Sequence, residues 1–199
     1  PDSAYPSALE KEKEEAISLT FTRGELTEVN GEKGTQVALI QTLQNQAKQF
    51  AIGRDIHVGD TIIGIKGRVG FEAAAPAIII KAHHLLEKHT LSKWQQFQKE
   101  QLSNFYGMQL HEGHYLDPVM RDMEAFMESS QKKVNGTVYI KLYPYRFELL
   151  GIRSPNDLMQ AEFGSYGEMN KGWTAEEAKG FIKLTANATK IYQHLNKEQ

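Results

Sequence analysis

Two cations and a set of glycines in the middle of the sequence have the types and spacing that could bind an anion. Lys66 and Arg68 are separated by one residue, so in a β-strand their side chains would project from the same face. Gly64, Gly67 and Gly70 surround them and would let the backbone approach a bound group closely. The spacing matches neither the P-loop nor the dinucleotide-binding fingerprint. An anion site and a twisted strand that ends in a glycine-relieved bend therefore both stay open.

A second group of polar residues has a spacing that can ligate a metal. His83 and Glu87 lie four residues apart and would share one face of a helix, with His84 and His89 beside them. No second cluster of this kind accompanies them in the sequence. We therefore interpret the group as a solvated helix face and predict no metal site.

Other motifs and the composition exclude several chemistries. The segment His111–His114 resembles a zinc-protease motif, but Gly113 interrupts the helix that such a motif needs, so we predict a turn between helices. Zero Cys excludes thiol nucleophiles, disulfides and Cys-ligated metals, and no G-x-S-x-G elbow occurs. Acyl transfer through a nucleophile of this chain is not expected.

Charge and hydropathy limit the partners. Lys+Arg 23 against Asp+Glu 25 gives a net charge of −2, which favours neither nucleic acid nor an anionic membrane surface. The longest apolar stretch, Ala73–Ile80, is interrupted by Pro76 and is far shorter than the ~18–20 residues of a spanning helix. The first residues lack the pattern of a secretory signal. We expect no membrane and no nucleic-acid partner, and a cytoplasmic location.

The elements that must position these residues follow from periodicity. Ile17, Leu19 and Phe21 alternate with polar residues and predict a strand of a hairpin that turns at Asn30-Gly31. Helical spacing predicts an amphipathic helix over Thr35–Ala51. A strand is predicted over Asp60–Arg68, followed by a helix that Pro76 opens and that runs to the His89 region.

The second half is predicted to be helical and then to form another hairpin. Helices are expected from Leu91 through Leu102 and over Tyr115–Val134. Asn135-Gly136 then introduces strands over Thr137–Leu142 and Arg146–Leu150. The tail has a capping box at Thr174 and Glu177, and Gly180 is expected to break its helix into two pieces. The expected fold class is α+β, with antiparallel hairpins packed against several helices and an extended C-terminal helical arm.

Several separated motifs occur in an order that resembles argininosuccinate synthase, over nearly the whole chain from about Ala16 onward. Each motif alone would be weak, but their common order is difficult to obtain by chance. The motifs are Phe21–Gly24, Ile62–Arg68 followed by Phe71-Glu72, Val134–Gly136, Gly151 with Arg153-Ser154-Pro155 and Leu158, and Thr174 with Gly180-Phe181-Ile182.

The resemblance is to the C-terminal synthetase and oligomerisation part of that family, whose whole enzyme condenses citrulline with aspartate in arginine biosynthesis. It implies a reaction that consumes ATP, with Mg as its counter-ion, and gives argininosuccinate, AMP and pyrophosphate. The family's Ser-Gly-Gly-Leu-Asp-Thr-Ser loop for the ATP pyrophosphate is absent from this sequence. The resemblance therefore implies that ATP binds mainly to a missing N-terminal domain and that this chain alone is inactive.

The resemblance also implies a division of the chain. Residues 1–15 would be a linker from the N-terminal ATP-binding domain, and residues 16–172 the synthetase domain. Residues 173–199 would be a helix that joins subunits into a homotetramer. A helix packed on its own domain is the alternative for this last segment.

Two positions where the family contacts citrulline carry different residues here. A family Glu aligns with Gly59, and a family Tyr aligns with Phe71, just before the retained Glu72. Losing the Glu removes the charged acceptor for the α-ammonium of citrulline, and an unpaired bound charge is costly. A register change in which Asp60 or Glu72 supplies the missing carboxylate is the simpler explanation.

The other explanation is that the substrate itself differs. An N-acylated citrulline has no α-ammonium, and Gly59 would leave room for the acyl group. Lys66, Arg68 or His57 would then meet a carboxylate on that group. The rival function class for the whole chain is a non-catalytic binding or assembly module with the same fold.

Overall fold

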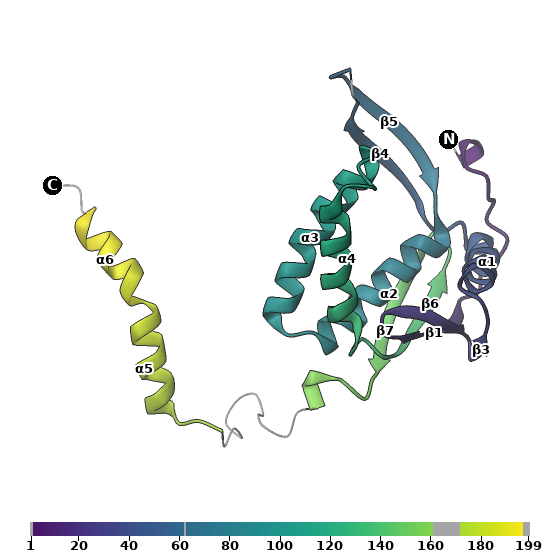
Figure 1. Cartoon of the computed structure of the whole chain (residues 1–199). Coiled ribbons are helices and arrows are strands. Elements are labelled where there is room, and N and C mark those ends of the chain that lie inside the picture. The colour runs from purple at the N-terminus through teal and green to yellow at the C-terminus, as the bar shows by residue number, and fades with distance from the viewer. Residues whose placement is uncertain (1, 62, 161–171, 197–199) are drawn as a thin grey trace. The chain divides into compact units, whose positions relative to one another are not determined.

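A computed structural model of the chain describes residues 2–61, 63–160 and 172–196 (Figure 1). Its α-helices are α1 (Gln36–Ala47), α2 (Ala74–Thr90), α3 (Lys93–His111), α4 (Pro118–Gln131), α5 (Ala175–Thr185) and α6 (Asn187–Leu195). Its strands are β1 (Glu15–Thr22), β2 (Glu25–Val29), β3 (Glu32–Lys33), β4 (Arg54–Asp60), β5 (Lys66–Glu72), β6 (Gly136–Tyr143) and β7 (Arg146–Arg153). The predicted α+β class is confirmed. The fold divides into two compact units, Pro1–Leu158 and Met159–Gln199.

The larger unit is built on a five-stranded antiparallel sheet with the order β3-β2-β1-β6-β7. The central pair is β1 and β6, in which Ile17 faces Ile140 and Leu19 faces Val138. All four side chains are buried, as the alternation of apolar and polar residues along each strand requires when one face is covered. The predicted hairpin of β6 and β7 is confirmed, as is the strand that contains Ile17, Leu19 and Phe21. The first hairpin turns at Arg23-Gly24, however, whereas the predicted turn at Asn30-Gly31 joins β2 to β3.

Helices α1 and α2 cover the buried face of this sheet and complete one hydrophobic core. The Thr35 hydroxyl caps α1 by accepting a hydrogen bond from the Ala38 backbone N–H. The residues of the two helices that join the core recur at helical spacing, although Val37 and Ile40, which belong to the apolar spacing of the first helix, are exposed. The core residues are Leu39, Leu43 and Ala47 of α1 and Ala74, Ala75, Ile78, Ala82 and Leu86 of α2.

Helices α3 and α4 form a helical hairpin beside α2 (Figure 1). Ser92 and Gln95 form a capping box that starts α3, and the Asp117 side chain accepts from the Val119 N–H to start α4. Between them, Gly113 has a φ of +82°, a conformation that favours glycine. The predicted turn at His111–His114 is confirmed.

The predicted continuous strand over Asp60–Arg68 is wrong. Strand β4 ends at Asp60 and β5 begins at Lys66, so a tight turn lies between them. Gly64 turns the chain with a φ of +84°, and the Thr61 N–H donates to the Ile65 carbonyl at 3.1 Å. The apolar residues near this turn have strand propensity, but the glycine conformation decides the local structure. The result is a separate two-stranded sheet.

The predicted helix break at Gly180 is also wrong. Gly180 lies inside α5, and the two C-terminal helices meet at Ala186 instead. A glycine costs a helix only about 1 kcal/mol relative to alanine, which the capping box of Thr174 and Glu177 helps to offset. The capping box itself is confirmed.

The first residues of the chain lie against the rest of the larger unit. Backbone N–H groups of Glu10 and Lys11 both donate to the Gln49 carbonyl, at 2.8 and 3.0 Å. The interpretation of residues 1–15 as a linker, and the other two domain boundaries, stay predictions.

Candidate functional site

The candidate site is the β4–β5 hairpin, which carries every predicted substrate-binding residue. Its strands pair antiparallel, with Arg54 opposite Glu72 at the base and Asp60 opposite Lys66 at the far end. Residues that face each other across an antiparallel pair share a face, and alternate residues lie on opposite faces. The predicted residues therefore divide between two faces, with His57, Gly59 and Phe71 on one and Lys66, Arg68 and Glu72 on the other.

The first face has a gap in its row of side chains. Gly59 pairs with Gly67, so neither strand contributes a side chain at that level. The ring of His57 leans toward this gap, because its Nε2 lies 2.6 Å from the position that a Cβ on Gly59 would take. Phe71 is on the same face, about 14 Å from the level of Gly59 along the strand, by the rise of ~3.4 Å per residue. This face offers the imidazole of His57, a possible hydrogen-bond donor, where the resemblance leads one to expect a carboxylate.

The second face carries the cations. Lys66 and Arg68 share it, as predicted, and both are exposed. Lys66 forms an ion pair with Asp60 across the hairpin, but both side chains are largely exposed, so this pair adds little stability. This face could bind an anion, but Gly59 is on the opposite face of the hairpin.

The base of the hairpin is held by a buried ion pair. Arg54 Nε lies 3.4 Å from the Glu72 carboxylate, whose side chain is only 1% exposed. The same guanidinium donates to the Ser7 carbonyl and lies over the rings of Tyr5 and Tyr145, at 4.8 and 5.5 Å from their centroids. Glu72 is thus placed as an anchor of the hairpin and of the first residues of the chain.

Sequence reasoning did not identify Arg54 as the partner of Glu72. The signal that could have found it is the hairpin register, because Arg54 and Glu72 are the outermost pair once the turn is placed at Gly64. The wrong prediction of a strand over Asp60–Arg68 concealed that register.

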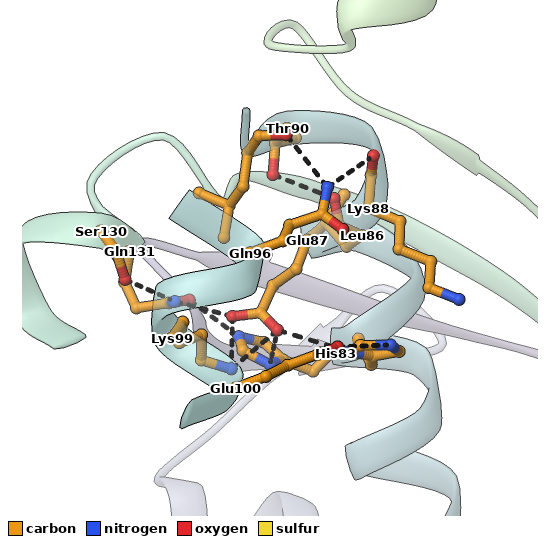
Figure 2. Close-up of polar contacts among 12 residues, drawn as sticks. His83, Leu86, Glu87, Lys88, Thr90, Gln96, Lys99, Glu100, Ser130 and Gln131 are labelled. Carbon is orange, nitrogen blue, oxygen red and sulfur yellow. Dashed lines mark hydrogen bonds and ion pairs between the residues drawn. The ribbon is translucent and has the colours of Figure 1, made fainter. Parts of the chain in front are cut away.

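A second polar cluster lies between three helices of the same unit. Glu87 of α2 is 3% exposed and its carboxylate is central in Figure 2. It accepts from the ammonium of Lys99 on α3 at 2.7 Å and from the side-chain amide of Gln131 on α4 at 2.7 Å. The interpretation of His83 and Glu87 as a solvated helix face is therefore wrong, because α3 and α4 cover that face.

The tautomer of His83 follows from its neighbours. The Gln131 amide nitrogen donates to Glu87 and to Ser130, so the amide oxygen accepts from His83 Nε2 at 2.9 Å. His83 Nδ1 then faces the Glu87 carboxylate at 3.7 Å. Burial lowers the pKa of His83 below its usual value, while the charge of Glu87 acts in the opposite direction.

Neither cluster forms a metal site. Among the residues that the structure describes, no group of three or more His, Cys, Asp or Glu side chains is placed to hold a metal ion. Within those same residues, no helix combines the length and apolar character needed to cross a bilayer.

Comparison with known proteins places the fold in a family context. The family model described as "Arginosuccinate synthase C-terminal domain" matches residues 3–192. The argininosuccinate synthase of Xanthomonas axonopodis pv. citri is 35% identical over 199 residues, covering 99% of this chain and 46% of that protein. The argininosuccinate synthase of Dictyoglomus thermophilum is 35% identical over 176 residues, covering 88% of this chain and 44% of that protein. This chain spans about half the length of the curated relatives that it matches.

Proposed function

This chain belongs to the argininosuccinate synthase family, and on that premise we propose that it is the synthetase and oligomerisation part of an ATP-dependent ligase. The complete ligase would join citrulline, or an N-acylated citrulline, to aspartate and release AMP and pyrophosphate. The family match over residues 3–192 is the observation that carries this proposal. The reaction would belong to cytoplasmic arginine biosynthesis.

The residues of this chain would contribute part of the citrulline pocket through the β4–β5 hairpin. Condensation through an adenylate depends on positioning and on charge stabilisation more than on a covalent nucleophile. ATP with its Mg counter-ion would supply the leaving group, and the sequence of this chain has no glycine-rich pyrophosphate loop to hold it. We therefore expect this chain alone to have no ligase activity.

The register of the hairpin supports the N-acylated substrate more through His57 than through Lys66 and Arg68. His57 shares a face with Gly59 and Phe71, and its ring lies beside the space that Gly59 leaves empty. Lys66 and Arg68 are on the reverse face. An imidazole can donate to an acyl carbonyl or carboxylate, whereas it is a weaker partner for an ammonium than a carboxylate is.

The test uses the longer ligase that the proposal requires, with pyrophosphate release measured for citrulline, N-acetylcitrulline and N-succinylcitrulline. We expect an N-acylated substrate to be preferred. The double variant Gly59→Glu, Phe71→Tyr should reverse that preference by about 10-fold or more, as expected when a charged partner is gained or lost. Ordinary efficiency with citrulline and none with either acylated form would overturn the substrate, though not the ligase assignment. Absence of pyrophosphate release with all three would favour the binding-module alternative.

The second unit supports assembly into a homo-oligomer. Helices α5 and α6 expose large apolar side chains at helical spacing, a pattern typical of a surface that another helix covers. The proposed assembly is a homotetramer through this arm. The exposed residues are Phe181, Ile182, Leu184, Ile191, Tyr192 and Leu195.

A further inference from the structure

The outer face of α3 carries an apolar stripe. Trp94, Phe97, Phe105 and Met108 are 69%, 54%, 42% and 46% exposed, and none of the residues of α3 is buried. Gln101 lies at the centre of the same stripe and is also exposed. At 100° per residue the five side chains fall within about 80° of the helix circumference, which is the narrow seam of a helix that pairs with another helix.

The inner side of α3 is already occupied. Lys99 points inward to the buried carboxylate of Glu87, and Tyr106 donates to Glu124 of α4 at 2.8 Å. These contacts fix the rotation of α3 about its axis and so hold the apolar stripe toward the outside. The stripe is therefore a surface left open after α3 has packed in the larger unit.

The spacing along the stripe reads the same in both directions. Its members are separated by three, four, four and three residues, with Gln101 in the middle. Such a pattern is self-complementary when two identical helices run antiparallel about a twofold axis. Trp94 would then meet Met108 of the other copy, Phe97 would meet Phe105, and Gln101 would meet Gln101.

We propose that α3 pairs antiparallel with α3 of a second copy of this chain, about a twofold axis at Gln101. The neighbours of the stripe fit this arrangement. Gln98 and Asn104 lie on its two sides, also symmetric about Gln101, so their polar side chains would face each other across the axis. No charged residue is on the stripe, so the pairing buries no unpaired charge.

The area of the stripe limits its strength. Half-exposed aromatic and Met side chains leave on the order of 100 Å² each to bury, so the stripe supplies about 400 Å² per copy. A standard interface uses about 800 Å² per partner. We therefore expect α3 pairing to be weak. This surface is separate from the α5–α6 arm and does not depend on the ligase assignment.

The chain has no cysteine, which allows a direct cross-linking test. Paired helices lie ~8–10 Å apart with Cα atoms at a radius of ~2.3 Å, so facing Cα atoms come within about 3.4–5.4 Å, which overlaps the ~4.4–6.8 Å range of a disulfide. Gln101→Cys should therefore form a cross-linked dimer under mild oxidation. Glu100→Cys is the matched control, because it is exposed at the same height on α3 but points away from the stripe. We expect at least about 10-fold less cross-linking for Glu100→Cys.

The register is tested by mixing two single variants. Trp94→Cys and Met108→Cys should each fail to cross-link alone, because the two copies of either residue would be about 21 Å apart along the axis. Their mixture should give a heterodimeric disulfide. Cross-linking of either variant alone would overturn the antiparallel register.

Other occupants of the stripe would give different outcomes. We expect Gln101→Cys cross-linking to persist when Phe181→Ser and Tyr192→Ser disable the arm, and to fall when Phe97→Gln is added. If the arm of another copy covers the stripe, Gln101→Cys will not cross-link until the arm is disabled. Equal cross-linking of Gln101→Cys and Glu100→Cys, or none in either background, would also overturn the proposal.

Discussion

The carboxylate of Glu87 joins three helices through one buried charge. It lies on α2 and accepts from Lys99 of α3 and Gln131 of α4, so each of these helices contributes one donor. Removing one member of a buried ion pair leaves the other without compensation, which costs more than the pair contributes. The cluster therefore fixes the position of the α3–α4 hairpin against α2, independently of its net contribution to the free energy of unfolding.

Replacing Glu87 should destabilise the fold strongly. We expect Glu87→Leu to lower the free energy of unfolding by about 2–4 kcal/mol, somewhat below the range for fully buried pairs because the Lys99 side chain is 20% exposed. Urea denaturation measures this change. The double variant Glu87→Leu, Lys99→Met is the control, and it should recover part of the loss because no charge stays unpaired. A single variant within about 0.5 kcal/mol of the parent would contradict this account.

His83 should make stability depend on pH. Burial lowers its pKa below the usual value of 6.5, so the folded state binds this proton more weakly than the unfolded state does. Stability is then fully present above pH 6.5 and declines as pH falls from 6.5 toward the lowered pKa, by at most about 1.4 kcal/mol per pH unit. Urea midpoints between pH 8 and pH 5 measure this slope. His83→Gln should flatten it, and an unchanged slope would assign the effect to other groups.

At the scale of elements, the β4–β5 hairpin depends on its base. A two-stranded sheet is marginally stable in water without further packing. Here the base is closed by the Arg54–Glu72 pair and by the Ala73 N–H, which donates to the Gly53 carbonyl at 2.9 Å. Gly53 makes this approach possible with a φ of +87°. A Cβ there would lie 2.5 Å from the Ala74 nitrogen.

Gly53→Ala should therefore destabilise the protein at the root of the hairpin. We expect a loss of about 2–4 kcal/mol, from backbone strain together with the contact against Ala74. Gly31→Ala is the matched control, because Gly31 has a φ of +80° but nothing within 4 Å of its Cβ position. It should cost only about 1 kcal/mol, from strain alone. Equal losses in thermal or urea unfolding would show that the contact does not matter.

The sequence predicted most elements because their signals are local. The capping residues Thr35 and Thr174 and the alternation around Leu19 each identify an element from neighbouring residues. The predictions that failed depend on contacts between residues that are far apart in the sequence. The partners of Glu87 lie 12 and 44 residues away on two further helices, so no spacing rule could show that its face is covered. The two faces of the candidate site likewise required the hairpin register, which the missed turn at Gly64 determines.

At the scale of the whole molecule, the described part of the second unit has no core of its own. No residue of α5 or α6 is buried, although both helices are amphipathic in sequence. Helices this short are marginal in water unless an apolar face is covered. This supports an arm whose stability comes from association.

Disabling the arm should reduce association of the chain. We expect Phe181→Ser together with Tyr192→Ser to lower the concentration-dependent mass measured by light scattering, because both variants remove large exposed apolar side chains. Lys183→Ser with Lys190→Ser is the control, since these are exposed polar positions on the same helices. If the unaltered chain is a strict monomer at all concentrations, the arm does not associate on its own.

The β4–β5 hairpin, which carries the candidate substrate-binding residues, is held at its base. A small rotation at the base therefore moves its far end. From Arg54 to Asp60 it extends about 20 Å, by the rise of ~3.4 Å per residue. A rotation of ~10° at the base would therefore displace the far end by about 3.5 Å, whereas residues next to the base would hardly move. Phe71 and Glu72 lie near the pivot, whereas Gly59 and Lys66 lie near the moving end. Small adjustments at the contact between Arg54 and the Ser7 carbonyl would thus be amplified near Gly59, the position proposed to select the substrate.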